Sequence, residues 1–264
     1  MDINRKKREK ALEKELDSAL KREIRLRRAA KKAKSPVWKT ELASKIPDKV
    51  YFGLESAFCK AFSLVFNQGR WVVERSYNKA KLQENQAVRD YAVQVKGGRK
   101  ELKQVRRGAE RSSGWNLALT TAEGIALGAL GSGMPDIVLF ISTVLKGIYE
   151  TALNYGFEYE SRAEQYIILK MMAASLSTGE AWVEQTNEIE TLMEEPLAVT
   201  EEAVKAQIRE TASVFAMDML ILKFIQGLPI VGIIGGAANP VYYRKVMRYV
   251  QLMYRKRYLL KQKK

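Results

Sequence analysis

The chain has 264 residues, with 45 Lys and Arg, 30 Asp and Glu and no histidine, and its net charge is +15. A hydrophobic content of 47% excludes wholesale disorder and allows one large domain or two small ones. The absence of histidine excludes Ser-His-Asp and Cys-His catalysis and histidine-ligated zinc. Cys59 is the single cysteine, so no internal disulfide can form, and its apolar neighbours predict a buried, inert thiol.

Positive charge is concentrated at the two ends of the chain. Residues 1–34 carry a net charge of +8 and residues 241–264 carry +9, so the residues between them sum to about −2. Basic ends on a near-neutral body favour a polyanionic partner, either an anionic membrane surface or nucleic acid. The alternative is that both ends are only solvated and keep the protein soluble.

Residues 3–34 are predicted to form one long charged helix. Apolar residues recur there at three- and four-residue steps: Leu12, Leu16, Ala19, Leu20 and Ile24. Because this stripe is narrower than a full core face, the helix either lies on another surface or frays alone. Ser35-Pro36 ends the pattern. We therefore divide the chain into a basic N-terminal helical extension, 1–34, and an all-α domain, 35–264.

Apolar residues at helical spacing predict the remaining elements. Helices are expected over residues 48–68, 70–95, 135–155, 161–177, 204–226 and 241–260. Pro135 suits the first helical position, and the Asp136 carboxylate favours the positive end of that helix. No stretch shows the alternation typical of a strand, so the predicted fold class is an all-α multi-helix bundle.

Residues 180–202 hold eight acidic residues and no basic one. A run of like charge is usually a solvated segment. The alternative is that these carboxylates are internal partners of the basic ends.

Two Gly/Ala-rich apolar segments each contain a pair of glycines four positions apart, which places the pair on one helix face. The pairs are Gly124 with Gly128 and Gly232 with Gly236, and Gly235 belongs to the same small-residue stripe. Such faces let two helix backbones approach closely, so we expect residues 124–132 to pack against residues 229–238. A phosphate-binding loop is not expected, because the segment lacks Gly-Lys-Ser/Thr and no strand precedes it.

Residues 124–145 and 212–243 approach the length of a membrane span, which is roughly 20 apolar residues. Asp136 interrupts the first stretch, and Asp218 and Lys223 interrupt the second. A charge at mid-bilayer costs about 2.5–3.5 kcal/mol, so we expect two buried helices of a bundle. Insertion into lipid stays an alternative.

Residues 241–260 combine a basic and an aromatic helix face. Five cations fall within about one third of the helical circumference: Arg244, Lys245, Arg248, Arg255 and Lys256. Tyrosine, valine and methionine occupy the opposite side, which suits a helix docked on the bundle or lying in an anionic headgroup layer. We take these five residues as the candidate membrane- or polyanion-binding set. Nucleic acid would accept the same charge, although no known nucleic-acid-binding motif accompanies it.

Asp136 and Asp218 are acids in apolar surroundings, and as a pair they could act as acid and base or bind a metal. Helix capping accounts for Asp136, and we expect Asp218 to contact Lys223 or Arg209. No catalytic residue, metal ligand or cofactor is therefore predicted. An enzyme that uses carboxylates or a carboxylate-bound metal stays an alternative.

Two stretches carry a resemblance to a known family. Residues 131–157, GSGMPDIVLFISTVLKGIYETALNYGF, combine a Gly-rich turn, a Pro/Asp helix start, an apolar helix and a Tyr-Gly-Phe ending, and residues 228–239 read LPIVGIIGGAAN. In this order they resemble the EcsC protein family of bacteria. Residues of about 45–260 follow the family's order, with the charged N-terminal helix outside it.

The resemblance implies a bacterial source and an association with membranes or transport, and it supplies no catalytic residue. Together with the charge pattern, it leads us to expect a peripheral, non-catalytic protein at the inner face of the cell membrane, in the cytoplasm. Its partners would be an anionic membrane surface and membrane transport proteins, in support of an ABC transporter or an envelope process. A nucleic-acid-binding helical protein is the main alternative.

Overall fold

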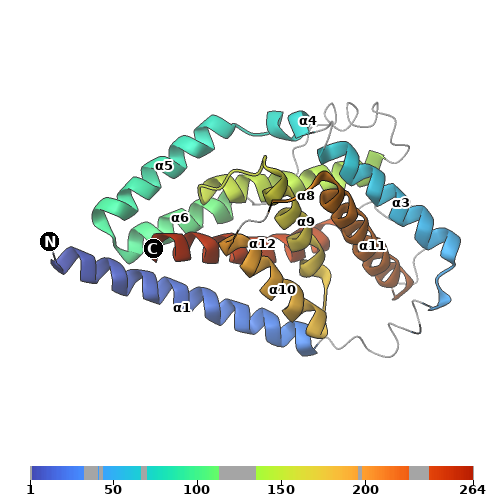
Figure 1. Cartoon of the computed structure of the whole chain (residues 1–264), viewed down its shortest axis with the longest axis horizontal. Helices are drawn as coiled ribbons and strands as arrows, with labels where there is room; N and C mark the ends of the chain where they lie inside the picture. Colours follow the sequence, from blue (N-terminus) through green and yellow to red (C-terminus); the bar gives the residue numbers. More distant parts are fainter. Residues whose placement is uncertain are drawn as a thin grey trace.

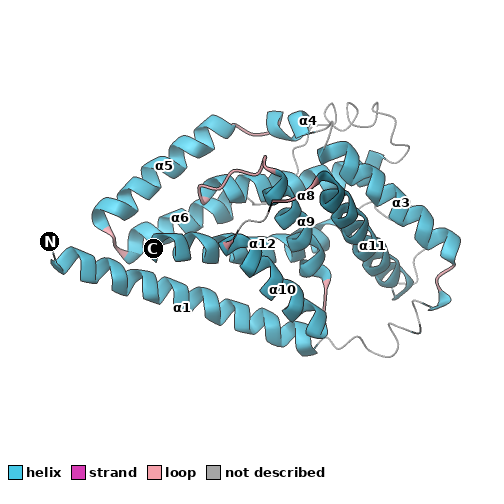
Figure 2. Ribbon diagram, viewed as in Figure 1, coloured by secondary structure: helices cyan, strands magenta, loops and turns pink. Residues whose placement is uncertain are grey.

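The structure is a computed structural model that describes residues 2–32, 41, 44–66, 70–112, 135–195, 198–225 and 238–263. Within these ranges the chain forms ten helices and no strand, so the predicted all-α bundle is confirmed (Figures 1 and 2). The helices are α1 (Asp2–Lys32), α3 (Asp48–Leu64), α4 (Arg70–Arg75), α5 (Lys79–Lys96), α6 (Arg99–Ser112), α8 (Pro135–Asn154), α9 (Arg162–Leu176), α10 (Gly179–Glu194), α11 (Glu201–Ile225) and α12 (Ala238–Lys263).

The centre of the bundle is made by α8, α9 and α12, and α12 packs on both α8 and α9. Helix α8 is apolar nearly all round, as expected for a helix with no solvent face. At one end, α3 and α11 form a pair around an aromatic cluster in which the Phe215 ring lies 5.7 Å from Phe58 and 5.9 Å from Phe62. Burial of these rings, rather than helix propensity, holds the two helices together.

Helix α8 begins and ends with the local features that the sequence contains. Pro135 is its first residue, and Asp136 lies exposed in its first turn. Gly156 follows the last turn with φ of 75°, and the N–H of Phe157 donates to the carbonyl of Ala152 at 3.0 Å. This left-handed glycine stop satisfies carbonyls that the helix end leaves without a partner.

The predicted helix over residues 70–95 is wrong in one respect, because the structure has two helices there. Helix α4 ends at Arg75, and α5 begins after Asn78, whose side chain accepts a hydrogen bond from the N–H of Lys81 at 2.9 Å. An asparagine side chain that caps the next helix competes with continuation of the previous one.

The turn between α5 and α6 packs closely on α1. Gly97 ends α5 with φ of 57°, and a Cβ atom at this position would lie 2.9 Å from the Cβ of Arg8. Glycine is therefore required both for the left-handed backbone and for the close approach to α1.

Helix α1 is docked along the bundle and does not fray alone. It lies along the lower edge of the view in Figure 1, antiparallel to α12, so that both chain ends lie at the same end of the molecule. Ala11, Leu12 and Ala19 are buried against the bundle. The predicted boundary between residues 34 and 35 lies outside the described residues.

The five glycines of the predicted packing stripe also lie outside the described residues, and their close packing stays a prediction. They are Gly124, Gly128, Gly232, Gly235 and Gly236. Among the helices that the structure describes, none combines the length and the hydropathy of a membrane span.

Candidate anionic-surface interface

Helix α12 is a core helix, and it buries two of the five cations in the candidate set. Arg255 is 4% exposed and Lys256 is 6% exposed. The tyrosines predicted to line the opposite face are buried as well, including Tyr242, Tyr249 and Tyr254. Because α1 covers one side of α12 and α8 and α9 cover the other, the basic side of this helix faces protein over its C-terminal half.

Arg255 belongs to a buried cluster around Glu15 of α1, which is 1% exposed. Glu15 accepts a hydrogen bond from Arg255 at 2.7 Å and from Arg99 of α6 at 2.8 Å. Arg106 lies 3.7 Å away. Burial alone would raise the pKa of Glu15, but these arginines lower the pKa below its ordinary value. One carboxylate therefore ties α1, α6 and α12 together.

Lys256 is held by two carboxylates, those of Glu23 on α1 and Glu190 on α10. Other members of the acidic run make similar pairs: Glu180 with Lys31 at 2.9 Å and Glu188 with Lys170 at 2.9 Å. Single members of the acidic segment thus meet the basic ends, Glu180 with Lys31 and Glu190 with Lys256, whereas Glu188 pairs with Lys170 in the body of the chain. Glu190 is partly buried, but the other seven acidic residues of 180–202 are exposed. Both interpretations therefore hold in part, because the segment is mostly solvated and two of its carboxylates pair with the basic ends.

The other three cations of the candidate set lie at the beginning of α12. Arg244 and Arg248 are exposed. Lys245 is partly exposed and pairs with Asp218 of α11 at 3.6 Å, a contact that the sequence analysis did not predict. Burial and, second, the Asp218 carboxylate raise the pKa of Tyr242 beside it. Asp218 is thus a structural partner of α12, and no group of three or more Cys, Asp or Glu that could hold a metal ion occurs in the described part of the chain.

A longer exposed array of cations than that of α12 lies on α1, where sequence analysis did not place a site. Seven exposed basic side chains recur at helical spacing and form what we call the cationic stripe: Lys7, Lys10, Lys14, Lys21, Arg25, Arg28 and Lys32. At 1.5 Å per residue the stripe is roughly 37 Å long. Asp17 is the one acid at the same spacing, and it pairs with Lys21 at 2.7 Å.

The cationic stripe faces away from the bundle because the opposite side of α1 is docked. Residues at the docked positions, such as Leu12, Glu15 and Ala19, are buried. On a helix, positions three and four apart share one face, so the stripe and the docked residues lie on opposite sides of α1. Packing on one side therefore fixes the direction in which seven charges point.

Two large apolar side chains lie beside the cationic stripe. Leu20 is 41% exposed and Ile24 is 47% exposed. They are one turn apart, next to Lys21 and Arg25 along the chain, and so form an apolar flank to the stripe. Basic residues with adjacent exposed leucine and isoleucine are typical of helices that lie in a lipid headgroup layer.

A recess of about 410 Å³ opens between α1 and α6 beside the stripe. Its lining consists of Lys14, Asp17, Ser18, Lys21 and Arg25 from α1, with Arg99 from α6. Four of these six side chains are cations, and Arg99 is fixed by its bond to the buried Glu15. The recess is therefore a place where a compact anionic group can meet several cations at once.

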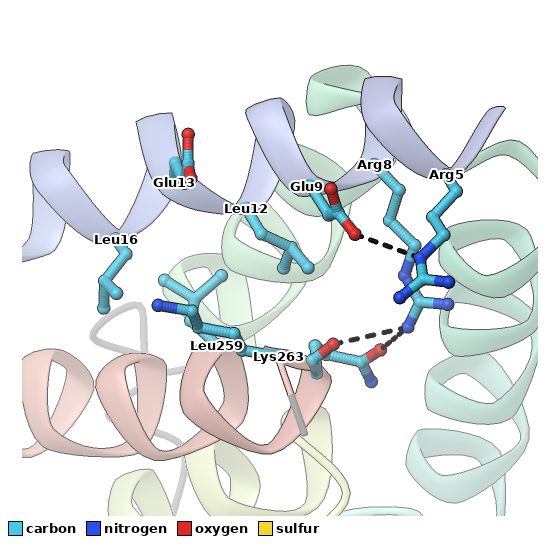
Figure 3. A pocket seen from close by; sticks show the side chains of 9 residues that line it. Arg5, Arg8, Glu9, Leu12, Glu13, Leu16, Leu259 and Lys263 are labelled. Atoms are coloured by element: carbon cyan, nitrogen blue, oxygen red, sulfur yellow. Dashed lines mark hydrogen bonds and ion pairs between the residues drawn. The ribbon is translucent and has the colours of Figure 1, made fainter. Parts of the chain in front are cut away.

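A second groove, of about 390 Å³, lies between the first turns of α1 and the last turns of α12 (Figure 3). Leu12, Leu16 and Leu259 form its apolar floor, as Figure 3 shows. Arg8 spans its mouth and donates to Gln262 Oε1 at 3.0 Å. The protein's own side chains thus bridge the groove and connect α1 with the end of α12.

Comparison with known protein families matches residues 7–259 to the EcsC protein family. The match begins within α1, so it includes the helix that carries the cationic stripe, whereas the resemblance seen in the sequence covered only about residues 45–260. No curated protein and no solved structure matches the chain. A match over nearly the whole chain shows the relationship: the chain belongs to the EcsC protein family.

Proposed function

We propose that this protein is a peripheral membrane protein, which docks on the anionic inner surface of a bacterial cell membrane through the cationic stripe of α1. The single observation that carries the proposal is the stripe itself, seven exposed cations on one side of a helix whose other side is buried. Each basic residue close to an anionic surface contributes about 1 kcal/mol, so several acting together give stable docking.

The apolar flank favours a lipid surface over nucleic acid. Leu20 and Ile24 have no role against a phosphodiester backbone, but they can enter the headgroup layer next to the stripe. The exposed Arg244 and Arg248 of α12 extend the proposal as a further cationic contact. In this proposal the chain binds rather than catalyses, and it supports a transport or envelope process at the membrane.

Flotation with vesicles tests the proposal. The full chain is expected to float with vesicles of 70% phosphatidylcholine and 30% phosphatidylglycerol in 50 mM NaCl, and to remain unbound with phosphatidylcholine alone. The Debye length falls from about 10 Å at 0.1 M salt to about 3 Å at 1 M, so 1 M NaCl is expected to release the protein. Equal recovery with neutral and anionic vesicles, unaffected by salt, contradicts electrostatic docking.

A matched pair of variants locates the docking surface. The stripe variant replaces Lys10, Lys14, Arg25 and Arg28 with glutamine, and the control variant replaces the exposed Lys45, Lys49, Lys60 and Lys81. Both variants lose four charges, but only the stripe variant is expected to lose at least tenfold in vesicle affinity. At about 1 kcal/mol per cation, the loss of four cations from the docking surface would account for more than a tenfold change in affinity. Equal losses would mean that net charge, and not α1, governs binding. Binding of random DNA that needs the same four residues would favour the nucleic-acid alternative.

A further inference from the structure

A second set of arginines, away from the cationic stripe, surrounds a hollow of about 340 Å³ between α5 and α6. The hollow is lined by Arg89 of α5 and by Gln104, Arg107, Gly108 and Arg111 of α6. Gln104, Arg107 and Arg111 are spaced three and four residues apart, so they share one face of α6 and converge on Arg89. No acidic residue takes part in the lining.

Arg89 is held in place by neutral partners. Its Nη2 donates to Asn154 Oδ1 at 2.7 Å, and its Nε donates to the carbonyl of Asn85 at 2.9 Å. Asn154 is buried at the end of α8, so it is a fixed acceptor. Because these partners carry no charge, the positive charge of Arg89 is oriented but not neutralised.

The carboxylates that could neutralise this cluster are engaged elsewhere. Asp90, next to Arg89 in the chain, accepts hydrogen bonds from Tyr258 and Gln262 of α12, each at 2.8 Å. Glu110, next to Arg111, lies 3.8 Å from Arg22 of α1. In the part of the chain that the structure describes, no carboxylate pairs with Arg89, Arg107 or Arg111.

Gly108 makes room for the oriented guanidinium. A Cβ atom at this position would lie 1.7 Å from Nη1 of Arg89, which is far inside the contact distance. The guanidinium therefore occupies the space that a side chain on α6 would fill. Glycine in a helix interior lowers helix stability relative to alanine, and here it leaves open the space that the Arg89 guanidinium occupies.

We propose that the hollow between α5 and α6 is a binding site for a phosphate group in its dianionic form. Guanidinium groups match phosphate oxygens in planar, two-point geometry, and three of them around one hollow suit a group with two charges and several acceptor oxygens. The amide of Gln104 adds a neutral donor. The phosphate belongs either to a soluble phosphomonoester or to a lipid headgroup such as that of phosphatidic acid. This site does not depend on the membrane docking proposed for α1.

Calorimetric titration of the full chain tests the site, with inorganic phosphate and glycerol phosphate as probes. The Arg107→Gln, Arg111→Gln double variant is expected to lose at least tenfold in affinity for both. The Lys100→Gln, Lys103→Gln variant removes equal charge from the same helix and is expected to stay within twofold of the wild type. Gly108→Ala removes no charge and leaves a good helix former, yet it is expected to weaken binding at least fivefold by displacing Arg89.

Vesicles distinguish the two sources of phosphate. In the stripe-variant background, retention on phosphatidylcholine vesicles with phosphatidic acid, and competition by glycerol phosphate, would support the site and assign it to lipid. Binding of glycerol phosphate without retention on those vesicles would support it and assign it to a soluble phosphate. The proposal is overturned if the wild-type chain binds neither the soluble probes nor phosphatidic acid, or if both double variants lose affinity equally.

Discussion

The Glu15→Gln variant is expected to lose about 3–5 kcal/mol of unfolding free energy at pH 7, the cost of removing one partner of a buried ion pair. Glutamine keeps the shape of the side chain but not its charge, which leaves Arg255 buried at 4% exposure without a counter-charge. Arg99 and Arg106 lose the same partner. Because Glu15 joins α1, α6 and α12, the loss is expected to appear in global unfolding and not only in fraying of α1.

Urea unfolding followed by circular dichroism measures this loss, with Glu13→Gln on the exposed side of α1 as the matched control. The arginines lower the pKa of Glu15, so its stabilising effect is present above the pKa of the unfolded chain and is lost as the pH falls through the folded pKa. The difference between wild type and Glu15→Gln should therefore shrink in acid. If Glu15→Gln is as mild as Glu13→Gln, the cluster does not hold the helices together.

The Glu150→Gln variant is expected to be more stable than the wild type at alkaline pH. Burial raises the pKa of Glu150 in α8 to about 7, against the lowering effect of Lys146. A folded pKa above the unfolded value means that ionisation costs stability between about pH 4.5 and pH 7. Since one pKa unit corresponds to about 1.4 kcal/mol, glutamine should gain about 3 kcal/mol at pH 8.5 and little at pH 4.5.

Unfolding free energies at pH 4.5, 7 and 8.5 test this expectation, with the exposed Glu84→Gln on α5 as control. Glutamine at position 150 removes the titrating group, so the pH dependence that it contributes should disappear. A variant that is less stable than the wild type at pH 8.5 would show that the ionised carboxylate, paired with Lys146, is favourable in the folded protein.

Most helices were predictable from sequence because their apolar residues recur with one clear period. Helix α8 is the best example, since Pro135 and Gly156 mark its two ends and its apolar face lies between them. The break after Arg75 was missed because apolar periodicity continues across it. The feature that decides it is one side chain, Asn78, which could have been recognised as a helix N-cap.

The burial of Arg255 and Lys256 in the candidate set on α12 could not be predicted from the sequence. A helical wheel shows which residues share a face, but it does not show what packs against that face. Whether Lys256 faces solvent depends on Glu23 and Glu190, which lie far from it in sequence and are brought together only by the fold. The surplus of acids in residues 180–202 was the sequence feature that pointed to internal pairing.

The cationic stripe of α1 was visible as a spacing but was not recognised as a surface. Lys7, Lys10, Lys14 and Lys21 recur at helical steps in the sequence, yet their common direction matters only if the opposite face is fixed. Docking of Leu12 and Glu15 against α12 provides that condition. The hollow between α5 and α6 was not predicted either, because its lining comes from two helices and Asn154 of a third helix orients Arg89.

A fluorescent label on the outward face of α1 tests most directly whether this face meets lipid. In a Cys59→Ser background, an environment-sensitive dye is attached at Ile24→Cys beside the stripe, or at Val88→Cys on α5, which is 65% exposed in the native chain. Addition of vesicles with 30% phosphatidylglycerol is expected to shift the emission of the label at position 24 to the blue, and to leave the label at position 88 unchanged. No shift at position 24, under conditions where the protein floats with the vesicles, would contradict docking through α1.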